Sequence, residues 1–535
     1  MQPARSEKAV TSHAGEGSAT GPRSLREFIA ALEKAGELER WTRPISLRDV
    51  ARVIESSDKA LLIEHPAGYP IPILANAMAS RRAWAVALGV PESEILQESR
   101  RRLARRIPPV RVPTGPVKEV IALGEEADLT TLPVYLQHEL DGAPYISAAM
   151  DVSRIPEGTG YNIGTRRLML RGWRETGIDM VAPSDLRANY RRARELGMTR
   201  FPIAMVVGTH PLNYLGSQLD LPTADEYEIL GGLRGEPVEV VKCETIDLEV
   251  PADAEMVIEG YLDGDWSEVE GPFGEYHGGY GSAHLNPVFH VTAITRRRDA
   301  MFQTATIGGR KLYHTDTQGL MSFSAELAVW EVVSLAVGAP TQVYCPPASA
   351  GHHMRVSMRV KNPGDGRNAL LAALSTAWTK MAIVVDDDID VFDDRMVEWA
   401  ISTRVQADRD TFCVSGMSCA PIEPSLPPHE GALVTTAKLG IDATRRYDKP
   451  YNLFDIPRMP FAAAPLGERP EESGASVGEL ESQLLDTLES GPRFVDLLER
   501  FGKARSSDLV AAIGSLRERK LIRLDPEGRY WKAGA

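Results

Sequence analysis

The sequence predicts a multidomain protein of mixed α/β and α+β class. Three patterns along the chain predict it. Helices mix with short strands near the N-terminus, strands of period two dominate from about 117 to 310, and strands then alternate with helices from about 320 to 450. The expected parts are a disordered tail at 1–22, an N-terminal α/β domain at 23–116, a β domain at 117–315, a C-terminal α/β domain at 316–465 and a small module at 475–535.

The composition is that of an ordinary globular protein with several cores. Of 535 residues, 43% are apolar and 25% are charged, and the formal net charge is −14. This acidic balance argues against a general nucleic-acid or membrane-surface binder. We find no apolar run long enough to span a membrane, and residues 1–22 lack the apolar centre of a signal peptide. The four cysteines lack CxxC spacing, which favours a reducing cytoplasm without disulfides or a zinc site.

The N-terminal domain begins at a helix-start motif. In "SLREFIAALEKAGELERW", Ser24 and Glu27 form the pattern of a capping box, and the apolar residues that follow repeat at helical spacing. The segments "ALLIEH" and "IPILAN" predict short strands, and a helical pattern continues to about residue 104. Prolines crowd "RRLARRIPPVRVPTGPV", so we expect a linker there.

The central domain is predicted to be an antiparallel sheet or barrel. In "VEVVKCETIDLEV", Ile246, Leu248 and Val250 alternate with polar residues, and "VFHVTAITRR" alternates in the same way. One amphipathic helix, from about 184 to 196, interrupts the strands.

Strand and helix patterns alternate in the C-terminal domain. The pairs are "HHMRVSMRV" with "GRNALLAALSTAW", and "MAIVVDDDID" with "DDRMVEWAISTRV", which predicts parallel strands. After a Pro- and Gly-bearing linker at 465–474, helices fit 476–489, 494–501 and 507–519, and "LIRLDPEGRYWKA" fits a hairpin. Three helices followed by a hairpin give the order of a winged helix.

The stretch "EGPFGE" places Glu270 and Glu275 around a turn. Pro272 and the two glycines exclude a helix, and in a straight strand the two side chains would point to opposite faces. A bend at Gly-Pro-Phe-Gly can aim both carboxylates into one pocket, where each raises the pKa of the other. The alternative is an exposed turn with acidic ends.

Two further stretches carry polar groups that could bind a ligand. In "YNIGTRRLML", Asn162, Gly164 and Thr165 suit a phosphate, and only one of Arg166 and Arg167 can enter a pocket because alternate residues of a strand point opposite ways. The alternative is a strand with a solvated basic edge. In "LGSQLDLPTADEYEIL", Glu226 is a candidate metal ligand, although a helix start also explains the acids there.

Taken together and in order, these segments resemble the UbiD family of reversible decarboxylases, which use prenylated FMN. The resemblance is carried by "NIGTRR", "GEPVEVVKCETIDLEVPADAEMVIEGYL", "EGPFGEYHG", "VFHVTAITRRRDA", "IVVDDDIDVFDDRMVEWAISTR" and "AKLGIDAT", and it covers roughly residues 24 to 460. It implies an N-terminal α/β unit, a split β-barrel that binds the flavin, and a C-terminal α/β domain used in oligomer contacts.

The resemblance assigns a catalytic trio to Arg167, Glu270 and Glu275. Glu275 would be the general acid that delivers a proton to the carbon that loses CO2. Glu270 and Arg167 would hold each other and the substrate carboxylate in register. The modified flavin would take up the electrons that CO2 leaves behind.

The resemblance also implies a divalent metal, usually manganese, and a potassium ion beside the flavin phosphate. Asn162 and Glu226 match two ligands of the divalent metal, and Lys438 matches a lysine that meets the cofactor. The remaining residues expected around the cofactor are Ser147, Ile163, Gly164, Thr165, Arg166, Arg167, Ser184, Gly216, Ser217 and Gln218, and among them backbone groups of Ile163 and of residues 215–218 would face the potassium.

The sequence departs from the family pattern in two places. Where the family has a histidine as third metal ligand, "GIDMVAPSDLRANY" offers Asp185, or else Ser184. Manganese accepts carboxylate oxygen, but an aspartate at a helix start is also a common cap. The loop "TIGGRKLYHTDTQ" lacks the usual proline and acid, so Lys311 and His314 are candidate substrate contacts; a remodelled surface loop is the alternative.

The predicted function is reversible, non-oxidative decarboxylation of an aromatic or heteroaromatic carboxylic acid. An α,β-unsaturated acid or an aryl acyl-CoA acid is the alternative substrate. The expected partners are the acid, CO2, a separate flavin prenyltransferase and further copies of the chain, as a homodimer or homohexamer. A UbiD-like ligand sensor with a DNA-binding tail is a different class, but residues 476–535 carry 10 basic and 10 acidic residues, which argues against binding DNA.

Overall fold

The computed structural model describes residues 21–158, 160–180, 184–219, 221, 225–309, 311, 313–420, 422–426, 434–446, 454, 457, 459–460 and 474–534. The chain divides into two compact units, Met1–Lys449 and Pro450–Ala535. Most of the tail predicted at 1–22 and of the linker predicted at 465–474 lies outside the described residues.

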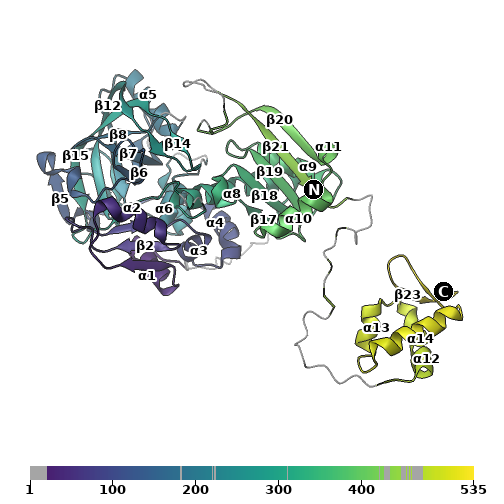
Figure 1. Ribbon diagram of the computed structural model, residues 1–535. Coiled ribbons are helices and arrows are strands. Elements are labelled where there is room, and N and C mark those ends of the chain that lie inside the picture. Colours follow the sequence, from purple (N-terminus) through teal and green to yellow (C-terminus); the bar gives the residue numbers. More distant parts are fainter. Residues whose placement is uncertain are drawn as a thin grey trace, which may run out of the picture. The chain divides into compact units, whose positions relative to one another are not determined.

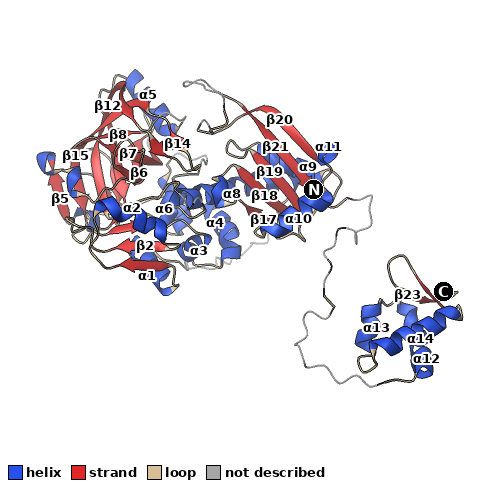
Figure 2. Ribbon diagram, viewed as in Figure 1, coloured by secondary structure: helices blue, strands red, loops and turns tan. Residues whose placement is uncertain are grey.

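The N-terminal domain is a small sheet with helices against it (Figures 1 and 2). Its helices are α1 (Leu25–Lys34), α2 (Leu47–Ser56), α3 (Arg81–Leu88) and α4 (Ile95–Leu103), and its strands are β1 (Leu38–Trp41), β2 (Ala60–Ile63) and β3 (Ile73–Ala75). A fourth strand, β16 (Phe302–Gln303), comes from the end of the central domain and pairs in parallel with β3. The N-terminal sheet is therefore completed by residues more than 200 positions away in the sequence.

The predicted capping box at the start of α1 forms only in part. The Ser24 hydroxyl accepts a hydrogen bond from the Glu27 amide at 3.2 Å, as expected. The Glu27 carboxylate accepts from the amide of Arg23, one residue before the cap. Both groups still satisfy donors at the open end of the helix.

The central domain contains a closed six-stranded barrel. Its strands are β6 (Tyr145–Arg154), β7 (Tyr161–Leu170), β8 (Glu175–Ile178), β9 (Phe201–Val207), β12 (Met256–Glu270) and β15 (His284–Arg296). Neighbours follow the order β12-β9-β6-β7-β8-β15, and β15 pairs again with β12 to close the ring. The split β-barrel expected from the sequence is thus present, and β5 (Val120–Leu123) pairs outside it with β15.

The barrel carries its helices in the crossovers between strands. They are α5 (Asp185–Glu195), which matches the predicted amphipathic helix, α6 (Pro211–Gly216) and α7 (Tyr227–Arg234). Two sequence predictions were wrong here. The proline-rich linker contains a strand, β4 (Val110–Arg111), and residues 245–250 are mostly a turn, because β10 (Glu239–Lys242) and β11 (Glu249–Pro251) fold back as a hairpin.

The C-terminal domain begins with the long helix α8 (Asp316–Val337) and continues as a five-stranded sheet. Its order is β17 (Gln342–Tyr344), β18 (His353–Met358), β19 (Met381–Asp386), β21 (Thr436–Ala443) and β20 (Thr411–Met417). The three central strands are parallel, as predicted, and both edge strands are antiparallel. The helices α9 (Asp365–Leu374), α10 (Asp394–Arg404) and α11 (Ala407–Asp410) connect them.

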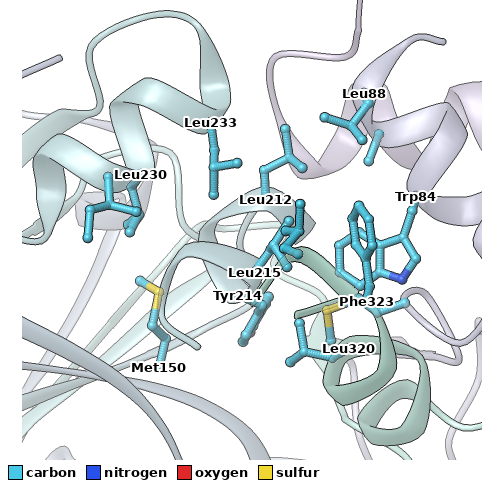
Figure 3. Packing of buried hydrophobic residues seen from close by; sticks show 14 of the residues in the cluster. Trp84, Leu88, Met150, Leu212, Tyr214, Leu215, Leu230, Leu233, Leu320 and Phe323 are labelled. Atoms are coloured by element: carbon cyan, nitrogen blue, oxygen red, sulfur yellow. The ribbon is translucent and has the colours of Figure 1, made fainter. Parts of the chain in front are cut away.

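Within the described residues, α8 is the one helix long and apolar enough to cross a membrane by length and composition alone. Of its most apolar 18-residue window, 56% is buried inside the protein. Figure 3 shows Leu320 and Phe323 of α8 in the core, and the ring of Phe323 lies 5.3 Å from that of Trp84 on α3. This buried packing is that of a core helix, and its core includes residues of all three domains of the first unit.

The first residue of α8 ties three segments together. The Asp316 carboxylate is fully buried and accepts hydrogen bonds from the amides of Asn76 (2.9 Å), Met78 (2.6 Å) and Thr306 (3.0 Å). Burial raises its pKa to about 6. The N-terminal domain, the loop after β16 and the start of the C-terminal domain therefore meet at one side chain.

The second unit has a core of its own. Its elements are α12 (Val477–Thr487), α13 (Phe494–Arg500), α14 (Ser506–Glu518) and a hairpin of β22 (Ile522–Leu524) and β23 (Tyr530–Lys532), which agree with the predicted winged-helix order. Nine buried residues, among them Leu484, Leu497 and Leu509, form the core. The exposed residues in the first two turns of α14 are Ser506, Ser507, Val510 and Ala511, without a basic side chain.

Candidate functional site

The turn after β12 brings the two glutamates together. Glu270 is the last residue of β12, the Gly271–Pro272 peptide bond is cis, and Gly271 adopts a φ of 93° that favours glycine. Residues Phe273–Gly274 form β13, which pairs with β14 (Tyr280–Gly281). The chain thus bends sharply between the two acids, as the sequence predicted.

Both carboxylates bind the same guanidinium. Arg167 Nε lies 3.0 Å from Glu270 Oε1, and Arg167 Nη1 donates to Glu275 Oε1. Glu270 is fully buried and Glu275 is 6% exposed. The exposed-turn alternative is therefore wrong for this pair.

Two further side chains complete this ion cluster. Asp179, directly after β8, lies 3.4 Å from Arg167 Nη2. The Phe273 ring lies 5.1 Å from the guanidinium carbon, so the cation faces an aromatic ring. Tyr145 packs on Phe273 at 4.1 Å between ring centroids, and its hydroxyl accepts a hydrogen bond from the Gly271 amide.

The surroundings shift the proton equilibria of the cluster. Burial raises the pKa of Glu275 to about 7, although Arg167 opposes the shift; Asp179 and, less strongly, Glu270 add to it. Mutual repulsion of the two glutamates is therefore a smaller cause than the sequence analysis assumed. Burial disfavours the charge on Arg167, but Asp179, Glu275 and Glu270 outweigh it and raise its pKa. Near neutral pH, Glu275 exists in both protonation states while Arg167 stays charged.

A second polar cluster lies nearer the start of β7, before Arg167. Glu226 accepts a hydrogen bond from the Ile163 amide at 2.5 Å, and the Asn162 amide group lies 3.4 Å from its carboxylate. Thr165 Oγ1 lies 2.7 Å from Ser217 Oγ. The structure thus brings together Asn162, Ile163, Thr165, Ser217 and Glu226, which were predicted as one site.

Asp185 lies within electrostatic range of this cluster. Burial raises the pKa of Glu226 to about 7, and the negative charge of Asp185 contributes. Ser184, and not Asp185, caps α5, because the Ser184 hydroxyl accepts from the Arg187 amide. The cap that the sequence analysis allowed for Asp185 is therefore made by its neighbour.

The donor set suits a hard divalent cation. Among the described residues, Asn162 Oδ1 is buried without a hydrogen-bond partner, while Nδ2 of the same amide lies 3.4 Å from the Glu226 carboxylate. Oxygen ligands of this kind are those that manganese and magnesium prefer. In the part of the chain that the structure describes, no group of three or more His, Cys, Asp or Glu side chains is arranged to hold a metal, and the oxygen donors gathered here are the Asn162 amide and the Glu226 carboxylate.

The two arginines of β7 have different partners, as strand alternation predicts. Arg167 faces the glutamates, whereas Arg166 lies 3.4 Å from the buried carboxylate of Asp151 on β6. Gly164 leaves room for that carboxylate, since a Cβ there would approach Asp151 Oδ1 to 2.7 Å.

Three other predicted cofactor residues are held by local contacts. The Ser147 hydroxyl donates to the Ala305 carbonyl at 2.7 Å and accepts from Gln137 Nε2 at 2.8 Å. Gly216 ends α6 where a Cβ would press on Leu230, and Gln218 Nε2 lies 3.4 Å from the Ser217 carbonyl.

Lys438 lies apart from these clusters. It is buried on β21, and its amino group donates to the carbonyls of Leu374 (3.0 Å) and Thr376 (2.5 Å). Burial lowers its pKa to about 8. The hydrogen bonds of Lys438 in the described part of the chain thus stay within the C-terminal domain.

Lys311 and His314 line a cavity of about 160 Å³ between α2 and the loop after β16. Lys311 Nζ pairs with Asp58 Oδ1 at 2.5 Å, and burial lowers the pKa of His314. Among the described residues, His314 Nε2 has no hydrogen-bond partner. The cavity wall shares Ile307 with the small core of Tyr145, Met169 and Phe273 under the turn.

Sequence reasoning missed Asp179, Asp151 and Tyr145. Each lies on or beside a strand that neighbours β7 in the barrel, so only the strand order reveals it. The sequence offered one clue, which was Asp179 in "GIDM", a short distance along the chain after Arg166 and Arg167. Nothing in the sequence shows how close these side chains lie in the folded protein.

A closed barrel between two α/β domains carries a buried Arg-Glu-Glu cluster and a cluster of oxygen donors beside β7, and an arrangement of this kind is typical of an enzyme active site. Three family models match the chain in order: the 3-octaprenyl-4-hydroxybenzoate carboxy-lyase N-terminal domain at residues 29–103, its Rift-related domain at 109–311 and its C-terminal domain at 318–443. The chain belongs to the UbiD family of carboxy-lyases and is a decarboxylase-type enzyme.

Solved structures agree with this assignment. The UbiD-class enzyme HmfF from Pelotomaculum thermopropionicum, in complex with FMN, is 34% identical over 82% of this chain and 98% of its own, with a TM-score of 0.76. The 3,4-dihydroxybenzoic acid decarboxylase AroY of Klebsiella pneumoniae is 26% identical over 82% and 97%, with a TM-score of 0.73. The vanillic acid decarboxylase of Sedimentibacter hydroxybenzoicus, in open form, is 26% identical over 87% and 99%, with a TM-score of 0.72.

The ion cluster makes a prediction about stability. Arg167→Met removes the cation that favours the charged form of the buried Glu275, so the pKa of Glu275 should rise further and the folded protein should bind more protons than the unfolded one. Stability relative to the wild type should then fall as pH rises, with a loss of about 3–5 kcal/mol at pH 8 and a much smaller loss at pH 5. Urea denaturation at both pH values measures this difference.

The matched control for this measurement is Arg395→Met, at an arginine whose side chain is 91% exposed. We expect the control to leave the urea midpoint unchanged at both pH values. A loss in Arg167→Met that is equal at pH 5 and pH 8 would contradict the prediction.

Proposed function

We propose that the protein catalyses reversible, non-oxidative decarboxylation of an aromatic or heteroaromatic carboxylic acid with prenylated FMN, and that Glu275 is the proton donor. The observation that carries the proposal is the buried Glu275 carboxyl, with a pKa of about 7, hydrogen-bonded to the same guanidinium as Glu270. A carboxyl that titrates near neutral pH can give up and regain a proton in each turnover.

Each member of the trio has a distinct role in this proposal. Arg167 binds the substrate carboxylate, since its fork of N–H groups matches a carboxylate. Glu270 and Asp179 hold Arg167 in place, and the Phe273 ring shields it from water. When bound, prenylated FMN supplies the electron sink for the pair left by CO2. Glu275 then protonates the carbon that carried the carboxylate, and in the reverse direction it removes that proton.

The cofactor would be held along β7. Asn162, Asp185 and Glu226 would bind a divalent ion, Mn²⁺ in the first place, that meets the flavin phosphate. Backbone groups of Ile163 and of residues 215–218 would face K⁺. Ser147, Gly164, Thr165, Arg166 and Ser184 complete the proposed cofactor contacts of the central domain, and Lys438 would meet the cofactor from β21 of the C-terminal domain. FMN or prenylated FMN is present in the two structures of the relative HmfF, which supports a flavin here.

The substrate would reach Lys311 and His314. Both line the cavity beside the loop of Ile307 and Gly308, and a Cβ at Gly308 would lie 3.4 Å from the Glu275 carbonyl oxygen. Two relatives are decarboxylases of 3,4-dihydroxybenzoic acid and vanillic acid, which favours an aromatic substrate over an α,β-unsaturated or aryl acyl-CoA acid.

The remaining partners follow from the same proposal. A separate flavin prenyltransferase supplies the cofactor, and the chain forms a homodimer or homohexamer in the cytoplasm. One relative is described as an evolved dimeric form. The DNA-binding alternative is not favoured, because the basic and acidic residues of 476–535 balance and the exposed residues in the first two turns of α14 are uncharged.

The proposal is tested by co-expression with a flavin prenyltransferase and anaerobic assay of aryl carboxylic acids for CO2 release. Mass spectrometry should identify prenylated FMN as the released cofactor. Equal turnover with unmodified FMN would contradict the proposed dependence on prenylated FMN.

Glu275→Gln should abolish proton delivery while leaving the fold and the flavin content intact. We expect kcat to fall about a hundredfold or more, the usual size of a general-acid contribution. In the wild type, kcat for decarboxylation should decline as pH rises above about 7, because Glu275 loses its proton, whereas carboxylation should gain. Stopped assays in both directions across pH 5.5–8.5 measure this; parallel profiles would refute the assignment.

Asp185→Ala should lower both manganese content and flavin retention if Asp185 is the third ligand. Glu195→Ala removes an exposed acid at the other end of α5 and is the matched control. It should change stability by less than about 0.5 kcal/mol and leave both manganese content and flavin retention as in the wild type. Elemental analysis beside a melting curve separates the two variants, and wild-type manganese content in Asp185→Ala would exclude Asp185 as a ligand.

A further inference from the structure

Residues 138–142 pack against the turn that precedes Glu275. The amide of Gly142 donates to the Pro272 carbonyl at 2.8 Å, and the amide of Gly274 donates to Asp141 Oδ1 at 2.9 Å. A side chain at Gly142 would collide with the Gly271 carbonyl oxygen. The two segments therefore fit only because glycines line their contact.

The centre of this contact is His138. Its Nε2 lies 2.6 Å from the Ile307 carbonyl, and its Nδ1 lies 3.3 Å from both carboxylate oxygens of Asp141. Its ring fills the space above Gly274, where any Cβ would overlap the imidazole. The ring also meets Phe273 edge-on, at 6.2 Å between centroids.

Both ring nitrogens of His138 face acceptors, so only the imidazolium can donate to both. Burial disfavours that charge, but the Asp141 carboxylate, the Ile307 carbonyl and Glu55 on α2 outweigh it and raise the pKa of His138. The titratable groups that face the ring are Asp141 on its own segment, Glu55 on α2 and Tyr280 on β14, whose ring lies 6.1 Å away.

The bonds of His138 fix the chain on two sides of Glu275. On one side, Asp141 holds the amide of Gly274, the residue directly before Glu275. On the other, Nε2 holds the carbonyl of Ile307, and the next residue, Gly308, packs beside the Glu275 carbonyl. His138 itself is directed at a carboxylate and a main-chain carbonyl, and neither bond involves the carboxyl of Glu275.

We propose that His138, oriented by Asp141, is a positioning residue that holds the Glu275 carboxyl in place for proton transfer. The role rests on the proposed function of Glu275. The contacts of His138 with Asp141 and with the Ile307 carbonyl, which we call the clamp, are formed by this chain's own loops. A shift of about 1 Å in a reacting group can cost on the order of a hundredfold in rate, so a loop contact of this kind has a kinetic effect.

His138→Ala should lower kcat by about 10- to 100-fold, with KM changed less than about threefold and flavin content unchanged. His138→Gln retains one N–H donor and should recover most of the loss. The clamp is present below the raised pKa of His138 and lost as pH rises through it. The alkaline decline of kcat should therefore involve two protons in the wild type and one in His138→Gln.

A second readout does not depend on activity. Hydrogen–deuterium exchange of a peptide spanning residues 271–275 should become about tenfold faster or more in His138→Ala, because the Gly274 amide loses its fixed acceptor. A peptide from β19 should not change. The matched control is His290→Ala, at a histidine on β15 whose ring nitrogens lie 3.2 Å from Glu175 Oε1 and 3.7 Å from Asp263 Oδ1. It should leave both exchange and kcat as in the wild type.

The outcomes separate the clamp from the proposed function. Wild-type kcat in His138→Ala, or unchanged exchange at 271–275, overturns the positioning role. A fall in kcat that only tracks lost flavin also overturns it. If the wild type releases no CO2 from any aryl acid, the proposed function fails, while the exchange result still decides whether His138 holds the turn. Should His138→Ala not fold, the proton count and exchange of His138→Gln decide in its place.

Discussion

One buried guanidinium sets the geometry of the candidate site. A buried cation must be matched by nearby negative charge, and Arg167 is matched by Asp179 after β8 and by Glu270 and Glu275 around the turn after β12. Burial of the Glu275 carboxyl disfavours its charge, and the negative charges of Asp179 and Glu270 add to this effect while Arg167 opposes it. Together these effects raise the pKa of Glu275 to about 7.

A fully buried carboxylate links the site to the domains around it. Asp316 accepts amides from the N-terminal domain and from the loop after β16, and it begins the helix that opens the C-terminal domain. The loop it holds also provides Ile307 and Gly308, which contact the surroundings of Glu275. The cavity wall, the turn and the domain junction are therefore connected through hydrogen bonds of Asp316, His138 and Asp141.

The sequence predicted the elements well where one local pattern dominated. The helix at 185–195, the parallel strands of the C-terminal domain and the three helices of the tail all have clear periodicity. The prediction of secondary structure was wrong at residues 245–250, where the alternation of apolar and polar residues continues through a turn. It was also wrong at 110–111, where neighbouring prolines favoured a linker over a short strand. The bend at 271–274 could be predicted from Gly and Pro, but Asp179 and the His138–Asp141 contact could not, because they depend on which strands and loops are neighbours in the closed barrel.

The pairing of β6 with β7 limits where single residues can be inserted or deleted in this part of the chain. The register between the two strands shifts between Ile146 and Ala149, beside the position of Arg167. Because side chains of a strand alternate, deleting or inserting one residue within β7 before Arg166 would exchange the faces to which Arg166 and Arg167 point. The arginine now paired with Asp151 would then point to the side of the glutamates. Changes of length are therefore tolerated in the connection between β6 and β7, but not inside β7 ahead of its two arginines.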